Sequence, residues 1–119
     1  MDLHEFSKAN RERCESPLGF NHSIDGWTPS DWMTAVVGEL GEAANIVKKL
    51  NRFRDGIPGN DQTEEELRTA LESELADTFI YLDLLSQSLG IVLNNSVFRK
   101  FNETSKIVGY PIELEGCPR

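Results

Sequence analysis

The sequence has few cysteines, few histidines and no long apolar run, and each shortage excludes a class of protein. Its 119 residues include two histidines and only two cysteines, Cys14 and Cys117. Disulfide scaffolds and structural zinc sites need more of these residues at closer spacing, so we expect two free thiols in a reducing compartment. No apolar run approaches the roughly 20 residues that cross a bilayer. The polar first residues, MDLHEFSKANRER, do not resemble a secretory signal.

Positive charge is also scarce. The chain has 12 Lys and Arg residues against 20 Asp and Glu residues, which gives a formal net charge of −8. Nucleic-acid polymers and anionic membranes are bound through clustered Lys and Arg, so we expect neither as a partner. Hydrophobic residues make up 39% and charged residues 27% of the chain, as in ordinary globular proteins. The length predicts a single domain over residues 1–119.

Strand patterns are weak, and the sequence predicts helices instead. There is no sustained alternation of apolar and polar residues and no Asn-Gly hairpin turn. Helical patterns cover about 3–13, 29–54, 64–89 and 95–108, with glycine- and proline-containing segments between most of them. The fold class predicted is therefore all-α, an antiparallel helical bundle of about four helices joined by short loops.

Two of these helices have clear start signals. Thr28 is followed three residues later by Asp31, and Thr63 is followed three residues later by Glu66. This spacing is that of a capping box, in which side chains at the two positions bind each other's backbone N–H groups. Gly90 suits the position just beyond a helix end.

Two pairs of carboxylates lie on helix faces that should pack inward. At about 100° per residue, Glu39 falls within the apolar arc of its helix and Glu42 at its edge, while Glu74 and Asp77 repeat this arrangement on the next helix. Four carboxylates facing inward are costly to desolvate and repel one another, and the same arcs lack Lys and Arg. The pattern predicts a divalent cation with hard oxygen ligands, Mg²⁺ or Mn²⁺.

The acids have two other interpretations. A single Glu-x-x-Glu pair is more often a solvated face, and it is the repetition on two helices that favours a metal site. A di-iron bundle uses Glu-x-x-His pairs, and Glu42 and Asp77 stand where that pattern has histidine. The di-iron interpretation is therefore the less favoured one.

The segments GELGEA (38–43) and ELAD (74–77) resemble the motifs of the MazG-like nucleotide pyrophosphohydrolases, which belong to the all-α NTP pyrophosphatase superfamily. The resemblance spans residues 27–114 and is closest in kind to short single-module phage and bacterial members. It implies that Glu39, Glu42, Glu74 and Asp77 bind Mg²⁺, with Mn²⁺ as a possible substitute. It also implies a homodimer or homotetramer in a bacterial or phage-infected host cytoplasm.

The activity implied by this resemblance is hydrolysis of a (deoxy)nucleoside triphosphate to the monophosphate and pyrophosphate. A metal-activated water would attack phosphorus, with Glu39 or Glu42 as the general base. A purine substrate such as dGTP or dATP is one possibility.

Substrate contacts are expected from several parts of the chain. Tyr81 matches a nucleotide-contacting tyrosine of dCTP-type relatives, and Lys100 looks like a lysine of the family. Flat rings and amide groups can recognise a base, and cations can bind phosphates. The expected substrate-binding residues are Asn21, Trp27, Trp32, Lys49, Arg52, Tyr81, Lys100 and Asn102.

Some of these residues also have a purely structural interpretation. Trp32 can be a core residue, and the cations of the second helix can be solvated charges favoured near a helix C-terminus. The chain departs from the family at Thr104 and Ser105, where relatives often have a basic residue. Two alternatives therefore stay open. One is a non-catalytic helical adaptor that binds a basic partner protein through acidic faces. The other is an intact family fold without activity.

Overall fold

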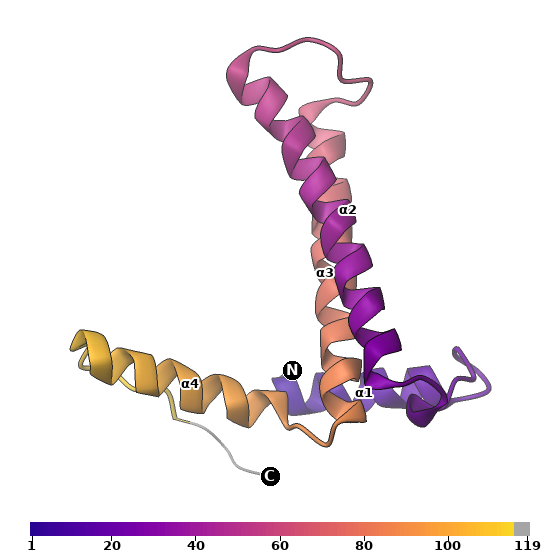
Figure 1. Ribbon diagram of the computed structural model, residues 1–119, viewed down its shortest axis with the longest axis vertical. Coiled ribbons are helices and arrows are strands. Elements are labelled where there is room, and N and C mark those ends of the chain that lie inside the picture. Colours follow the sequence, from indigo (N-terminus) through magenta and orange to yellow (C-terminus); the bar gives the residue numbers. More distant parts are fainter. Residues whose placement is uncertain (116–119) are drawn as a thin grey trace. The chain divides into compact units, whose positions relative to one another are not determined.

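The computed structural model describes residues 1–115, which form α-helices, one short 3-10 helix and no β-strand (Figure 1). Among these residues the all-α class is confirmed, and each helix end lies within two residues of its expected position. Cys14 is a buried free thiol, whereas Cys117 lies outside the described residues. The elements are α1 (Leu3–Glu15), η1 (Ile24–Gly26), α2 (Pro29–Asp55), α3 (Glu64–Ser88) and α4 (Leu93–Val108).

Both predicted capping boxes are present. The Thr28 side chain accepts a hydrogen bond from the Asp31 N–H, and the Asp31 carboxylate accepts one from the Thr28 N–H. Thr63 and Glu66 make the equivalent two bonds, each 3.1 Å long, before α3. α2 ends at Gly56, whose φ of 68° is a left-handed conformation that favours glycine. Local sequence chemistry therefore fixes where the two long helices begin and where α2 stops.

The described chain falls into two compact units, and each is considered by itself. One unit, Trp27–Leu82, is the helical hairpin of α2 and most of α3. Trp32 near the start of α2 contacts Tyr81 late in α3, and Glu39 further along α2 lies beside Glu74 earlier in α3. As residue numbers increase along α2, the numbers of the α3 residues that it contacts decrease. The two helices are therefore antiparallel (Figure 1).

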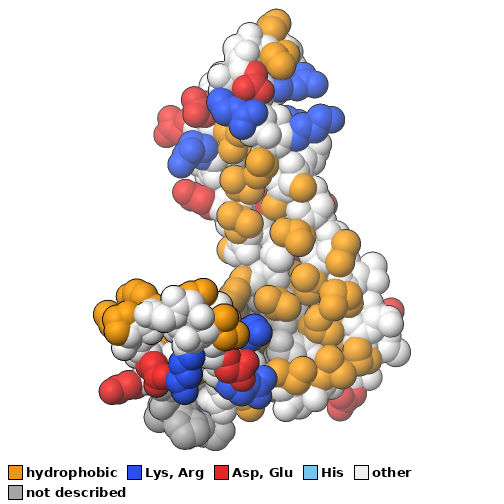
Figure 2. All heavy atoms as spheres, turned by 60° about the vertical axis from the view of Figure 1, so that its left-hand side comes forward, with side chains coloured by type: hydrophobic (Ala, Val, Ile, Leu, Met, Phe, Trp, Pro, Cys, Tyr) orange, Lys and Arg blue, Asp and Glu red, His pale blue; other side chains and the backbone are white. Residues whose placement is uncertain are grey.

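The hairpin buries only part of its apolar residues. Trp32, Val36, Ala43 and Leu67 are buried, as helical periodicity predicts. Other apolar side chains remain exposed, and Figure 2 shows hydrophobic groups along much of the hairpin. These exposed side chains include Met33, Val37, Leu40, Val47, Phe53, Leu75 and Phe79.

The other unit comprises residues 1–26 and the chain from Asp83 onward. A buried carboxylate holds α1 to the end of α3: Asp83 accepts hydrogen bonds from the Ser7 hydroxyl, from Asn10 Nδ2 at 2.9 Å and from Gln87 Nε2 at 2.9 Å. Gln87 Nε2 also donates to the backbone carbonyl of Ser7 at 2.9 Å. The cost of burying the polar Asp83 side chain is offset by these hydrogen bonds, so this residue is part of the packing between two helices.

α4 has an apolar side that the described chain does not cover. Val97, Phe101 and Val108 recur along it at helical spacing and are 48%, 44% and 72% exposed. Figure 2 shows hydrophobic side chains along one side of α4 and charged ones along another. Among the described residues of the whole chain, no single helix is long and apolar enough to span a membrane, although α3 and α4 taken together meet that test by length and composition.

Candidate functional site

Three carboxylates meet at the middle of the hairpin. Glu39 on α2 and Glu74 and Asp77 on α3 each place one carboxylate oxygen so that the three oxygens lie within 4.8 Å of one another. Glu74 and Asp77 are three residues apart and so project from the same face of α3. The antiparallel pairing brings Glu39 opposite them. Three carboxylate oxygens thus converge from two helices, an arrangement that can hold a divalent cation.

The acids differ in exposure. Glu39 and Glu74 are half-buried, whereas Glu42 and Asp77 are exposed, in agreement with their expected places inside and at the edge of the apolar arcs. Glu74 Oε2 is buried and has no hydrogen-bond donor among the described residues. A buried carboxylate oxygen without a donor is costly, and a proton or a cation would satisfy it.

The crowding of these acids disfavours their charged forms. The pKa of Glu42 is raised above its ordinary value chiefly by the neighbouring Glu74 carboxyl, through proton sharing and like-charge repulsion. The pKa of Glu74 is raised first by Glu39 and then by burial. Hard carboxylate oxygens, an unsatisfied buried oxygen and mutual repulsion together fit a divalent cation.

A cluster of aromatic rings lies on one side of the acids. The Trp27 and Trp32 ring centroids are 4.6 Å apart with their planes at 59°, and the Trp32 and Tyr81 centroids are 6.4 Å apart at 44°. Trp32 is 2% exposed, which agrees with its structural interpretation, whereas Trp27 is 38% exposed and Tyr81 is half-buried. Because Tyr81 follows Asp77 by one helical turn, the rings adjoin the acids along α3.

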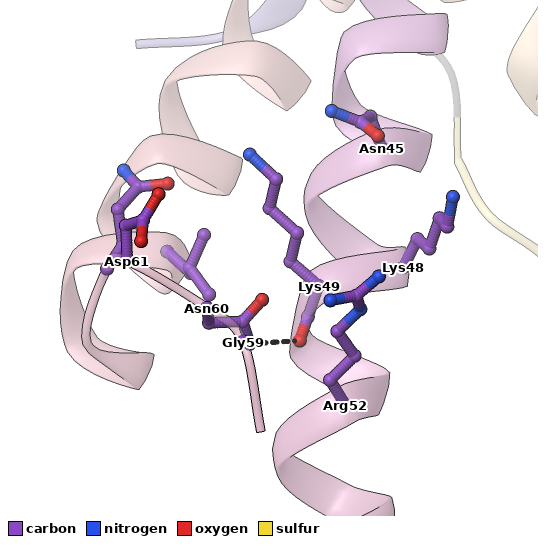
Figure 3. Close-up of a pocket in the computed structure, with 9 residues that line it drawn as sticks. Asn45, Lys48, Lys49, Arg52, Gly59, Asn60 and Asp61 are labelled. Atoms are coloured by element: carbon purple, nitrogen blue, oxygen red, sulfur yellow. Dashed lines mark hydrogen bonds between the residues drawn. The ribbon is translucent and has the colours of Figure 1, made fainter. Parts of the chain in front are cut away.

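A small basic pocket lies on the other side of the acids, toward the α2–α3 loop (Figure 3). Its cavity is about 160 Å³. Lys49 and Arg52, both expected as phosphate contacts, line it and are half-buried. The other polar members were not expected as substrate contacts, although positions 45, 48, 49 and 52 share one face of α2. These other members are Asn45, Lys48, Asn60, Asp61 and Gln62.

The remaining expected substrate contacts belong to the other unit, and their roles stay predictions. Asn21 is exposed in the loop after α1, with a φ of 50°. Lys100 lines an open apolar groove on α4. The Asn102 side-chain amide is engaged by the backbone of Leu114, donating to its carbonyl at 2.9 Å and accepting from its N–H at 2.8 Å.

Thr104 and Ser105 on α4 stand where relatives often have a basic residue, and the described chain has no free cation at these two positions. Ser105 is buried, and Thr104 carries no charge. The nearby Lys106 is ion-paired with Glu113 at 3.4 Å.

Comparison with known proteins identifies relatives. The Gene 37 protein of Mycobacterium phage L5 is 37% identical over 90 residues, which are 76% of this chain and 67% of that protein. dCTP pyrophosphatase 1 of Rattus norvegicus is 31% identical over 86 residues, 72% of this chain and 48% of that protein, and the Mus musculus protein matches over the same lengths. The chain thus spans about half the length of these pyrophosphatases.

No family model matches the chain, and no solved structure matches it significantly. The relatives therefore carry the assignment. The chain belongs to the same family as the mycobacteriophage Gene 37 protein, and the rodent dCTP pyrophosphatases are among its distant homologues.

Proposed function

We propose that this protein is a metal-dependent nucleoside triphosphate pyrophosphohydrolase of the MazG-like type, which releases a nucleoside monophosphate and pyrophosphate. The observation that carries the proposal is the convergence of Glu39, Glu74 and Asp77 within 4.8 Å. Homology to proteins named dCTP pyrophosphatase 1 supports the reaction class.

The carboxylates have a definite task in this reaction. A nucleoside triphosphate is strongly anionic, and an acidic wall repels it unless cations lie between. Mg²⁺ held by Glu39, Glu74 and Asp77 would supply charge neutralisation and acidify water. The two half-buried acids fix the geometry, since their side chains are restrained by the hairpin.

Glu42 is the better placed of the two candidate general bases. It lies one helical turn from Glu39 and adjoins Glu74, yet it is exposed and stands outside the converging set of three. A carboxylate not fully engaged as a ligand is available to accept the proton of an attacking water. Glu39 acts in this scheme chiefly as a ligand.

The aromatic cluster suits the base of the nucleotide. Trp27 is the most exposed ring of the three, and Tyr81 is the ring nearest to the acids along α3. Buried Trp32 supports both rings from behind rather than offering a free face. We propose a deoxynucleoside triphosphate as substrate, with dCTP, suggested by the relatives' name, and the purines dGTP and dATP as the candidates to compare.

Phosphate contacts are proposed for Lys49 and Arg52 on α2. Contacts from Asn21, Lys100 and Asn102, which belong to the other unit, stay predictions from the sequence. A charge-assisted hydrogen bond from Lys or Arg to phosphate is about twice as strong as a neutral one. These cations would therefore supply binding that the acidic wall cannot.

Self-association is also proposed. The hairpin and α4 leave apolar side chains exposed, among them Val37, Leu40 and Phe101, which a second copy of the chain can cover. A cytoplasmic location stays a prediction from the sequence.

The reaction is tested with a panel of NTPs and dNTPs in Mg²⁺, scored for pyrophosphate against orthophosphate. We expect pyrophosphate and monophosphate in equal amounts, and we expect Glu39→Gln and Asp77→Asn to abolish turnover while circular dichroism stays helical. Orthophosphate as the primary product would refute the proposal, as would near-full activity in both variants. Absence of turnover together with binding of a basic protein would favour the adaptor instead.

A further inference from the structure

The pocket at the loop end of the hairpin gathers unpaired positive charge. Lys49 and Arg52 are half-buried, and Lys48 lies at the rim. Among the described residues, none of these three cations forms an ion pair within 4.0 Å. Figure 2 shows Lys and Arg side chains gathered toward this end of the hairpin. In a chain of net charge −8, such a cluster is not explained by the overall composition.

The helix terminus accounts for part of this placement but not for all of it. Cations near the end of α2 are stabilised by its dipole, an effect that is weak at exposed positions. Exposed Arg54 illustrates that case, since it pairs with Asp55 at 2.8 Å on the surface. Lys49 and Arg52 instead line a hollow, where like charges repel and solvation is reduced.

The loop holds this hollow open in a defined way. Asn60 Nδ2 donates to the backbone carbonyl of Lys49 at 2.9 Å, which ties the loop to α2 (Figure 3). Gly59 has a φ of 120°, and a Cβ at that position would lie 3.3 Å from Arg52 Nη1. Glycine suits this positive φ, which residues with a side chain rarely adopt. The wall of the pocket is built by specific contacts of the loop.

The volume of the pocket and the chemistry of its lining side chains indicate which ligand it can hold. Pockets for whole small molecules measure roughly 300–1,000 Å³, so a cavity of about 160 Å³ is too small for a nucleoside. Guanidinium and ammonium groups bind phosphate oxygens, and the side-chain amides of Asn45 and Gln62 add neutral donors. Asp61 is the only carboxylate in the lining, so the pocket stays net positive.

The pocket is separate from the acidic cluster. Glu42 and Lys49 are seven residues apart on α2, which corresponds to about 10 Å along the helix axis. We propose that this pocket is a phosphate-binding site that works without metal and takes a phosphate or pyrophosphate group. The group could be the far end of a bound nucleotide or a free anion, and the chemistry of recognition is the same for both.

Calorimetric titration with inorganic pyrophosphate in the presence of a chelator tests the site. We expect wild type to bind, and Arg52→Gln and Lys49→Gln to weaken binding by about tenfold or more, the scale of a charge-assisted hydrogen bond. Arg54→Gln is the matched control, because it removes the same charge from the same helix outside the pocket, and Glu39→Gln should also bind normally.

Three results would overturn the proposal. They are absence of binding at millimolar pyrophosphate, equal binding in Arg52→Gln and wild type, and loss of binding in Glu39→Gln. The readout needs neither metal nor turnover, so it does not depend on the pyrophosphohydrolase proposal. The two sources are separated by the KM for a triphosphate, which rises in Arg52→Gln if the substrate occupies the pocket and is unchanged if the ligand is a free anion.

Discussion

At the scale of single residues, helical periodicity predicted the acids well and the aromatic residues incompletely. The 100° rule placed Glu39 and Glu74 inside the apolar arcs and Glu42 and Asp77 at their edges, and the structure half-buries the first two and exposes the others. The sequence does not distinguish a core role for Trp32 from a substrate-binding role. Periodicity shows which face of the helix a residue occupies, but not whether another aromatic ring packs over it.

The raised pKa of Glu42 predicts a pH-dependent stability difference. A carboxyl whose pKa is raised by folding stabilises the fold below its unfolded pKa of about 4.3, and this contribution is lost as pH rises through the folded pKa. Glutamine copies the neutral form. Metal-free Glu42→Gln should therefore match wild type in Tm below about pH 4 and exceed it as pH rises.

At neutral pH, saturating Mg²⁺ should make the Tm of wild type higher than that of Glu42→Gln, since deprotonated Glu42 then faces a cation. The comparison is made by thermal melts of both proteins from acid to neutral pH. Acids whose pKa is lowered, Glu15, Asp55 and Glu66, change alike in both proteins and cancel in the difference. A difference in Tm that does not vary with pH would contradict this account.

At the scale of helices and loops, ends with side-chain caps were predictable and irregular segments were not. Thr28 and Thr63 form the expected capping boxes, because capping depends on residues only three positions apart. The short helix at Ile24–Gly26 and the pocket wall at Gly59 and Asn60 had no such local signal. They depend on hydrogen bonds to residues more than two helical turns away, those from the Ile24 N–H to Glu15 and from Asn60 Nδ2 to the Lys49 carbonyl.

Removing a cap should destabilise the hairpin measurably. Thr28→Ala deletes the acceptor for the Asp31 N–H and should lower the free energy of unfolding by about 0.5–2 kcal/mol in denaturant titration. Thr34→Ala is the control, because its hydroxyl only donates to the Ser30 carbonyl one turn back, at 2.8 Å, within the same helix. Equal losses in the two variants would show that the capping box contributes nothing specific.

At the scale of the whole chain, the total charge and the local placement of charge lead to different predictions. The net charge of −8 predicts that polyanionic polymers are not partners. The same chain concentrates carboxylates at the middle of the hairpin and cations at its loop end, which no total charge reveals. Likewise, a hydrophobic content of 39% is ordinary for a globular protein, yet many of the hydrophobic side chains are exposed in the described chain.

This exposed apolar surface predicts self-association. Phe101 is 44% exposed on the apolar side of α4, so Phe101→Glu should shift the protein toward monomer in sedimentation velocity experiments. Glu103→Gln changes a residue that faces Arg99 on the charged side of α4 and should leave the assembly unchanged. A wild-type protein that is monomeric at every concentration would refute self-association.

Thermal melts with increasing Mg²⁺ or Mn²⁺ test whether the acids of α2 and α3 form one divalent-cation site. A cation that binds only the folded state adds about 2.7 kcal/mol of stability at a hundredfold excess over its Kd. We predict a saturable rise in Tm for wild type and for Glu72→Gln, an exposed acid outside the cluster, and little rise for Glu39→Gln and Glu74→Gln. The same rise in all four proteins, or no rise in wild type, would contradict such a site.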